Sequence, residues 1–135
     1  MAKIHEILRE GPSFSFEFGP PRTEEMERVL ERTLAELEPL APSYVSVTYG
    51  AGGTTRERTH GLVMQILRET GMTPMAHLTC ACHTRAELVE IVTRYRDGGI
   101  ENILALGGDP PRDLDLLPGE LTYAVELVRL VRELG

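Results

Sequence analysis

The chain has 135 residues, of which 41% are hydrophobic and 26% charged, a composition typical of an ordinary globular domain. A net charge of −7 argues against the attraction to phosphates on which nucleic-acid binding depends. Residues 1–6 carry charge where a signal peptide needs its apolar core, and no stretch approaches the roughly 20 apolar residues of a membrane span. These features predict one cytoplasmic domain, residues 1–135, that binds small molecules rather than nucleic acid or a membrane.

The first predicted strand and the first predicted long helix have different periodicities. Residues 13–18 alternate between polar side chains and phenylalanine, and the run stops at Gly19-Pro20-Pro21, as expected for a strand that ends sharply. From Thr23 onward the spacing is helical, until Pro39 and Pro42 end the run. The residues expected on the inner side of this helix are Met26, Val29, Leu30, Thr33, Leu34 and Leu37.

The same order of strand and helix is repeated three more times. Residues 44–48, 74–79 and 102–106 are predicted strands, and a stretch with helical spacing follows each of them. The expected inner residues of these helices are Leu62, Val63, Ile66 and Leu67; Leu88, Ile91, Val92 and Tyr95; and Leu121, Leu127, Leu130, Val131 and Leu134. Four successive βα units predict an α/β fold with a parallel sheet. Because a full (βα)8 barrel needs about 250 residues, periodicity alone leaves open a doubly wound sheet or about half a barrel.

Polar and glycine residues gather where the predicted strands end. Glu17 lies near the end of the first strand, and residues 48–53 follow the second. Residues 77–83 surround the end of the third strand, and residues 107–109 follow the fourth. In both candidate architectures ligands bind at the carboxyl ends of the strands, so we expect the functional site there.

Glu17 interrupts an apolar run between Phe16 and Phe18. Strand alternation predicts that it shares one face with Ser13 and Ser15, while the phenylalanines lie on the other face. Burial of this carboxyl would favour its protonated form and make it a usable proton donor. The alternative is a glutamate that is paired with a nearby arginine or exposed at the strand end.

Two loops at the strand ends invite a ligand interpretation. Residues 50–55 could present free amides to an anion at the start of the next helix, although they match neither of the common phosphate-binding motifs. The alternative is a turn that caps the helix with threonine. Asp109 follows two glycines and precedes two prolines, and its alternative role is to close an Asx-turn.

The cysteines and histidines do not form a recognisable metal motif. Cys80 and Cys82 are the only cysteines, and no mutual disulfide is expected between them. With His83 and His77 nearby, their spacing still matches no usual zinc pattern, and no metal site is predicted. For His77, within an apolar strand, a hydrogen-bonded core position is the alternative to a functional role. The remaining histidines, His5 and His60, are expected at solvated or capping positions.

Four segments, in order along the chain, resemble the motifs of one family, methylenetetrahydrofolate reductase. They are residues 14–22 (FSFEFGPPR), 47–51 (VTYGA), 76–80 (AHLTC) and 104–111 (LALGGDPP). Residues 56–60 (RERTH) and 123–128 (YAVELV) extend the similarity almost to the C-terminus. Four ordered motifs are far more specific than any one of them.

The resemblance implies a (βα)8 barrel, of which this chain would form the first four βα units, a half-barrel. It also implies FAD bound at the carboxyl ends of the strands. The flavin would take hydride from NADH or NADPH and pass it to 5,10-methylenetetrahydrofolate, which gives 5-methyltetrahydrofolate. The implied substrate is therefore a folate, and the implied role lies in one-carbon metabolism.

The resemblance also implies roles for individual residues. Glu17 matches the general acid that protonates the folate so that its methylene bridge opens. Asp109 matches the aspartate beside the pyrimidine edge of the flavin, where its charge would disfavour an anionic reduced flavin. The positions that match FAD contacts of the family are Thr48, Tyr49, Gly50, His77, Gly108 and Ala124.

This sequence departs from the family pattern in two residues and in length. Gly107 stands where the family commonly has an arginine, and Gly19 where it often has a phenylalanine. Four strands taken from a barrel are expected to leave two unpaired edges and an apolar inner face, which a homo-oligomer with two-fold symmetry could cover. Two other functions stay open: a catalytically silent half-barrel, and a different α/β enzyme that binds a phosphorylated substrate at residues 50–55.

Overall fold

The computed structural model describes residues 2–50, 54–109 and 118–135, and the parts of the predicted loops at 51–53 and 110–117 lie outside the described residues. The elements in chain order are α1 (Ile4–Glu10), β1 (Ser15–Phe18), α2 (Glu24–Leu37), the 3-10 turn η1 (Glu38–Leu40), β2 (Tyr44–Val47), α3 (Arg56–Glu69), β3 (Pro74–Thr79), α4 (Arg85–Asp97), β4 (Ile103–Leu106) and α5 (Ala124–Leu134).

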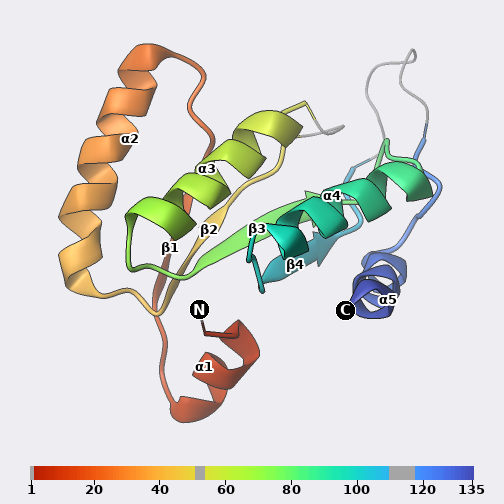
Figure 1. Cartoon of the computed structure of the whole chain (residues 1–135), viewed down its shortest axis with the longest axis horizontal. Coiled ribbons are helices and arrows are strands. Elements are labelled where there is room, and N and C mark those ends of the chain that lie inside the picture. The colour runs from red at the N-terminus through yellow and green to blue at the C-terminus, as the bar shows by residue number, and fades with distance from the viewer. Residues whose placement is uncertain (1, 51–53, 110–117) are drawn as a thin grey trace.

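The four strands form one parallel sheet in the order β1-β2-β3-β4 (Figure 1). Each strand pairs with the next strand in the sequence, as in consecutive units of a closed barrel, whereas a doubly wound sheet reverses its order. The predicted α/β fold and the four βα units are therefore confirmed. The observed strands agree with the predicted ranges within two residues, and β3 agrees at both ends.

Local hydrogen bonds explain where the crossover helices begin. Thr23 accepts a hydrogen bond from the backbone N–H of Met26 at 3.1 Å and caps α2, whose first turn is acidic. At α4, Thr84 and Glu87 form a reciprocal capping box, in which each side chain accepts a hydrogen bond from the other residue's backbone N–H. These caps satisfy amides that have no partner inside the helix.

Two predicted helix boundaries need correction. The run predicted to end at Pro39 leaves the α-helix at Leu37 and continues as the 3-10 turn η1, after which Ala41 adopts a left-handed φ of 51°. Pro39 lacks the N–H that the α-helical ladder would require. Leu121 was expected inside the last helix, but it lies before α5, because the Glu126 carboxylate accepts the amides of residues 122 and 123 and starts the helix later.

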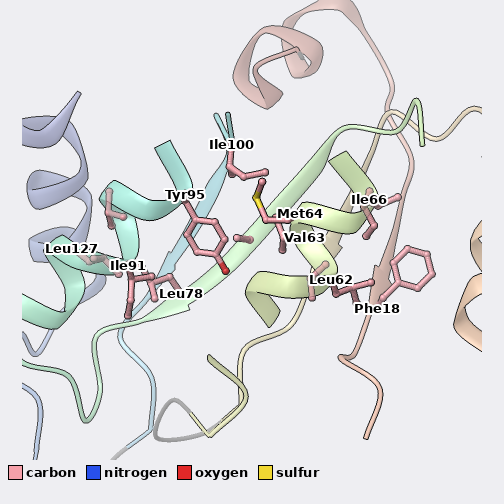
Figure 2. Close-up of a cluster of buried hydrophobic side chains, with 14 of the residues drawn as sticks. Phe18, Leu62, Val63, Met64, Ile66, Leu78, Ile91, Tyr95, Ile100 and Leu127 are labelled. Atoms are coloured by element: carbon pink, nitrogen blue, oxygen red, sulfur yellow. The ribbon is translucent and has the colours of Figure 1, made fainter. Parts of the chain in front are cut away.

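The core lies between the sheet and helices α3, α4 and α5. Figure 1 shows α3 and α4 along one face of the sheet, with α5 beyond α4, and these helices contact the strands or each other. The strand side chains Val45, Val47, Ala76 and Leu78 have no exposed surface. Figure 2 shows part of this cluster, in which Leu62 and Ile66 of α3 and Ile91 and Tyr95 of α4 pack with Leu78 and Phe18. All the predicted inner residues of α4 are buried.

Helix α2 packs less completely than its periodicity predicts. Leu34 is buried and Leu30 and Leu37 are partly buried against the core. Met26 and Val29 are 47% and 48% exposed, so the prediction that they face inward is wrong. Helical spacing identifies a stripe of side chains, but the width of the stripe that is covered depends on the neighbouring elements.

The opposite face of the sheet is open and mixed in polarity. Pairing aligns Glu17 with Ser46 and Ser46 with Met75, and strand alternation directs these side chains away from the helices. On β3 and β4 the corresponding residues are His77 and Thr79, paired with Leu104 and Leu106. The expectation of an apolar inner face is therefore wrong for the described strands, because β1 to β3 contribute mainly polar groups to it. No helix among the described residues is long and apolar enough to cross a membrane.

Candidate functional site

The parallel sheet collects the predicted site residues at one of its ends, since the carboxyl ends of parallel strands lie along the same edge. Glu17 and His77 lie on β1 and β3, with side chains on the open face. The segment Thr48–Gly50 follows β2, Gly108 and Asp109 follow β4, and Ala124 is the first residue of α5.

Glu17 of β1 contacts one side chain of β2, the adjacent strand, and one of β3, the next strand across the sheet. The Ser46 hydroxyl donates a hydrogen bond to Oε2 of Glu17 at 3.3 Å, and Nε2 of His77 lies 3.4 Å from the same oxygen. The open face therefore carries a carboxylate, a hydroxyl and an imidazole in a row across three strands. Ser46 belongs to no motif, and its only signal in the sequence is its position within the predicted strand 44–48.

The burial that was considered as one possibility for Glu17 is not observed, because its side chain is 59% exposed. It lies on an edge strand, and its side chain is on the face of the sheet that the helices do not cover. The contacts of its carboxylate are with Ser46 and His77 and not with an arginine, the partner considered in the alternative interpretation. Of the interpretations made from sequence, an exposed position near the strand end describes Glu17 best.

His77 is a largely buried base whose pKa is lowered, mainly because burial disfavours the charged imidazolium, while the Glu17 carboxylate acts in the opposite direction. Its ring is therefore neutral near pH 7. The contact with Glu17 lacks hydrogen-bond geometry, and within the described residues both Nε2 of His77 and Oγ1 of Thr79 are buried without a hydrogen-bond partner. Buried polar atoms without partners are unusual, and both lie on the open face.

The segment after β2 is tied to the strands and to α3. The Thr48 amide donates to the carbonyl of Phe18 at 3.0 Å, and the Thr59 hydroxyl donates to the Thr48 carbonyl at 2.8 Å. The Gly50 amide donates to Oγ1 of Thr55 at 2.7 Å. The expectation that Gly50 offers a free amide to an anion is therefore wrong. Thr55 occupies the N-cap position of α3, but its hydroxyl bonds the Gly50 amide and the Thr59 hydroxyl rather than a backbone amide of the helix.

Tyr49 points its hydroxyl at the start of α4. The hydroxyl oxygen lies 2.6 Å from Nε2 of His83, and the two rings are 5.8 Å apart. Burial raises the pKa of Tyr49 to about 12, so the phenol remains protonated at physiological pH. His83 was considered from sequence only as a metal ligand, although its spacing to Glu87, four residues on, is a recognisable signal for a side-chain contact at a helix start.

The segment after β4 passes so close to the end of β3 that only glycine fits at position 108. Gly108 has a left-handed φ of +79°, and a Cβ at this position would lie 2.8 Å from Cβ of Ala81 and 3.0 Å from Cβ of Thr79. Asp109 is exposed and lines a cleft of about 200 Å³ with Gly108 and Leu121. A side chain at position 107 would lie near the backbone that leads into α5, with a Cβ 3.8 Å from the Ala124 nitrogen.

Glu17 and Asp109 are not in contact. They belong to opposite edges of the sheet, with β2 and β3 between them. At the usual strand spacing, three steps across the sheet correspond to roughly 14 Å. The two carboxylates could therefore act only on different parts of a bound ligand or on two ligands.

The cysteines and the remaining histidines lie outside this arrangement. Both cysteines are free, and the Cys80 thiol is buried against the carbonyls of residues 106 and 107. The structure contains no group of three or more potential metal ligands among residues 2–50, 54–109 and 118–135. His60 was expected at a solvated or capping position, but its ring packs on Tyr95 with centroids 5.0 Å apart.

Comparison with known proteins identifies the family. Residues 3–135 match the family described as "Methylenetetrahydrofolate reductase". The 5,10-methylenetetrahydrofolate reductases of Salmonella typhimurium and Escherichia coli are 45% and 44% identical over 124 residues, which are 90% of this chain and 40% of each relative. Methylenetetrahydrofolate reductase (NADH) 1 of Arabidopsis thaliana is 34% identical over 135 residues, which cover 96% of this chain and 23% of that protein.

The chain thus spans less than half the length of these curated relatives, while nearly all of its own residues are matched. Its four βα units in barrel order agree with this match in both extent and topology. The chain belongs to the methylenetetrahydrofolate reductase family.

Proposed function

We propose that this chain supplies the FAD-binding and acid-catalytic part of an enzyme that reduces 5,10-methylenetetrahydrofolate to 5-methyltetrahydrofolate with NADH or NADPH. The observation that carries the proposal is the Glu17 carboxylate, held by Ser46 and His77 on the open face near the carboxyl ends of the strands. This is the position at which barrel enzymes keep their catalytic groups. Membership of the family supports the choice of reaction.

The residues on the open face fit a flat ligand with polar atoms along its edge. Nε2 of His77 and Oγ1 of Thr79 are buried without partners and could hydrogen-bond such a ligand. Gly108 exposes its backbone beside them, where a larger side chain would collide with Thr79. We propose that FAD binds here and contacts Thr48, Gly50 and Ala124 as well. FAD, when bound, supplies hydride transfer to and from the nicotinamide and folate carbons.

Glu17 is proposed to be the general acid for the folate. In the open sheet its carboxylate is exposed to water, but ligands that cover the face would remove that water and favour the protonated form. A neutral His77 adds no positive charge that would hold Glu17 ionised. The Ser46 hydroxyl keeps the carboxyl group oriented across the sheet.

Asp109 is proposed to act through its charge rather than by proton transfer. A carboxylate beside the pyrimidine edge of the flavin would disfavour the anionic reduced form of that ring, which tunes its reduction potential. The separation across the sheet is consistent with this division, since Glu17 would act on the folate and Asp109 on the far side of the cofactor.

The test is size-exclusion chromatography with light scattering after incubation of the chain with FAD, with absorbance recorded in the visible range. Flavin that co-elutes with the protein supports the proposal, and reduction of the bound flavin by NADH or NADPH should then be measured. A folded protein that elutes without flavin at saturating FAD would contradict the proposed cofactor site in this chain.

A catalytically silent assembly is the second candidate, and the exposed edges of the sheet favour it. β1 and β4 each have one unpaired side, and parallel strands from a second copy could pair with both in a two-fold homo-oligomer. Stable oligomers without flavin would support this function. The third alternative, a phosphorylated substrate at residues 50–55, loses support because the Gly50 amide is already bonded to Thr55.

A further inference from the structure

A chain of hydrogen bonds connects the segment after β2 to the first turn of α4. The Tyr49 hydroxyl lies 2.6 Å from Nε2 of His83, and Nδ1 of His83 lies 3.2 Å from Oε2 of Glu87. The His83 side chain is only 4% exposed, so its ring is held inside the structure between these two partners. Neither His83 nor Glu87 has a role in the proposed reaction.

The chemistry of the partners determines which group donates in each of these hydrogen bonds. A carboxylate can only accept hydrogen bonds, so Nδ1 of His83 donates to Glu87, and in the tautomer that carries its one proton on Nδ1 the other nitrogen, Nε2, is an acceptor. The Tyr49 hydroxyl then donates to Nε2. The bond from His83 lowers the pKa of Glu87, and burial raises that of Tyr49 to about 12, so both groups are in the protonation states that the chain requires.

Glu87, the last group in this series of hydrogen bonds, is itself bonded to the backbone at the start of α4. Oε1 of Glu87 accepts the Thr84 amide at 3.3 Å, while the Glu87 amide donates to Oγ1 of Thr84 at 3.1 Å. This capping box fixes the carboxylate that orients His83. The imidazole is therefore attached to a helix start rather than to a mobile surface side chain.

Tyr49, the first group in this series of hydrogen bonds, links residues 48–50 to α4. The carbonyl of Thr48 and the amide of Gly50 are bonded to threonines of α3 and its N-cap, and Tyr49 between them is bonded to α4 through His83. The segment is thus bonded to β1 through the Thr48 amide, to α3 and its N-cap through Thr59 and Thr55, and to the start of α4 through His83. The Tyr49 bond is the one that links it to α4.

We propose that His83 is a positioning residue for the cofactor site: oriented by Glu87, it accepts the Tyr49 hydroxyl and fixes the backbone of residues 48–50 where FAD would contact it. The identity of the ligand rests on the proposed function, whereas the attachment of the segment does not. His83 itself touches no reacting atom and acts through Tyr49.

The test compares four variants of the chain: His83→Ala, His83→Gln, Tyr49→Phe and the double variant Tyr49→Phe/His83→Ala. His5→Ala is the matched control, because His5 is an exposed histidine on α1. Two quantities are measured for each: the Kd for FAD from flavin fluorescence, and the hydrogen-exchange rates of the amides of residues 48–50. Urea unfolding reports the overall stability of each variant.

We expect His83→Ala and Tyr49→Phe each to raise the FAD Kd about two- to tenfold, the effect of one lost hydrogen bond. The double variant should lose no more than either single variant, because both changes remove the same bond. The amide of Gly50 should exchange faster in all three. His83→Gln, whose side-chain carbonyl can accept the Tyr49 hydroxyl, should recover part of both effects, and His5→Ala should change neither.

A purely structural role for His83 makes different predictions. It would lower the stability of His83→Ala, speed exchange throughout the sheet, and add to the effect of Tyr49→Phe without rescue by glutamine; that result overturns the proposal. Tyr49→Phe removes one oxygen and keeps the ring, so it remains informative if His83→Ala does not fold. Unchanged exchange at Gly50 in Tyr49→Phe also overturns it.

The same measurements separate this proposal from the proposed function. A wild-type chain that binds no FAD, but in which Tyr49→Phe and His83→Ala speed exchange of residues 48–50 equally, refutes the cofactor site in this chain and supports the attachment by His83. FAD binding that is equally tight in all variants, despite faster exchange, overturns the link between His83 and the cofactor site.

Discussion

At the scale of single residues, the contact among Glu17, Ser46 and His77 relates the fold to the proposed chemistry. The three side chains come from three adjacent strands, and their alignment follows from the pairing of Glu17 with Ser46 and of β2 with β3. Glu17 accepts a hydrogen bond while remaining exposed, so it is available to a ligand on the open face. His77 contributes a neutral ring rather than a second charge.

Replacing Glu17 by glutamine should separate the two half-reactions of the proposed enzyme. In whichever assembly of the chain binds FAD, Glu17→Gln should lower the rate of folate reduction about a hundredfold or more, since general acid catalysis contributes about 10²–10⁴. Reduction of the flavin by nicotinamide should stay within about twofold, as it needs no proton from Glu17. Stopped-flow absorbance measures both steps. Glu10→Gln, an exposed glutamate on α1, is the control, and unimpaired folate turnover in Glu17→Gln would refute the assignment.

The lowered pKa of His77 predicts a dependence of stability on pH. Between the unfolded value of about 6.5 and the lower folded pKa, the unfolded chain binds the proton more readily than the folded chain. The free energy of unfolding should therefore be highest above pH 6.5 and fall as the pH drops below it. Burial lowers the pKa of His60 as well, and this adds a slope of the same sign.

Urea unfolding at pH 7.5 and pH 5.5 checks this prediction. His77→Gln, which cannot titrate, should reduce the loss of stability between the two pH values, while His5→Gln should leave it unchanged because that side chain is exposed. A slope that is the same in the wild type and in His77→Gln would show that the ring does not bind its proton more weakly in the folded state.

At the scale of elements, the loops at the carboxyl ends of the strands leave less room for added side-chain atoms than the exposed faces of the helices do. The segment after β4 approaches β3 so closely that a Cβ at Gly108 would collide with Thr79 and Ala81, and a Cβ at Gly119 would collide with the carbonyl oxygen of Cys80. The helices instead tolerate exposed positions such as Gly61, which has open space around it. Substitutions of glycine should therefore have opposite effects in the two kinds of element.

Gly108→Ala should destabilise the chain by about 2 kcal/mol or more, because it combines a left-handed φ with a Cβ only 2.8 Å from Ala81. Gly61→Ala, in the interior of α3, should instead stabilise it by about 0.5–1 kcal/mol. Urea unfolding of both variants measures the two effects. Equal effects of the same sign would contradict the distinction between loop and helix.

At the scale of the whole molecule, the described elements leave a sheet that is open at both edges and on one face. Leu104 on β4 is 36% exposed on that face, and Val125 and Val128 of α5, a helix that contacts β4, are 52% and 38% exposed. At the other edge, α2 exposes Met26 and Val29. Unpaired strand edges flanked by apolar side chains favour association with further βα units.

If two copies associate through these edges, light scattering should give twice the 15.0 kDa mass of the chain. Leu104→Glu should then weaken the dimer, because it puts a charge on the inner face of an edge strand. Leu8→Glu is the control for the added charge, since Leu8 is 54% exposed on α1 and belongs to neither edge strand. A monomeric wild type, or equal effects of the two variants, would contradict a homodimer formed through β4.

The sequence by itself determined the four βα units, the parallel sheet and most of the helix-facing core. Period-two alternation in residues 13–18 and helical spacing at Leu88, Ile91, Val92 and Tyr95 are local patterns, and the structure confirms both. The positions of the strand ends, and so the edge at which candidate site residues gather, follow from the same order of elements.

Only the tertiary structure decided which side chains meet and which remain in water. Glu17 contacts His77, 60 positions away, Tyr49 contacts His83, and His60 packs on Tyr95. The exposure of Glu17 likewise depends on which elements cover the face of the sheet. Periodicity records the preference of each residue within its own element, whereas contacts and solvent exposure depend on how elements distant in the sequence pack together.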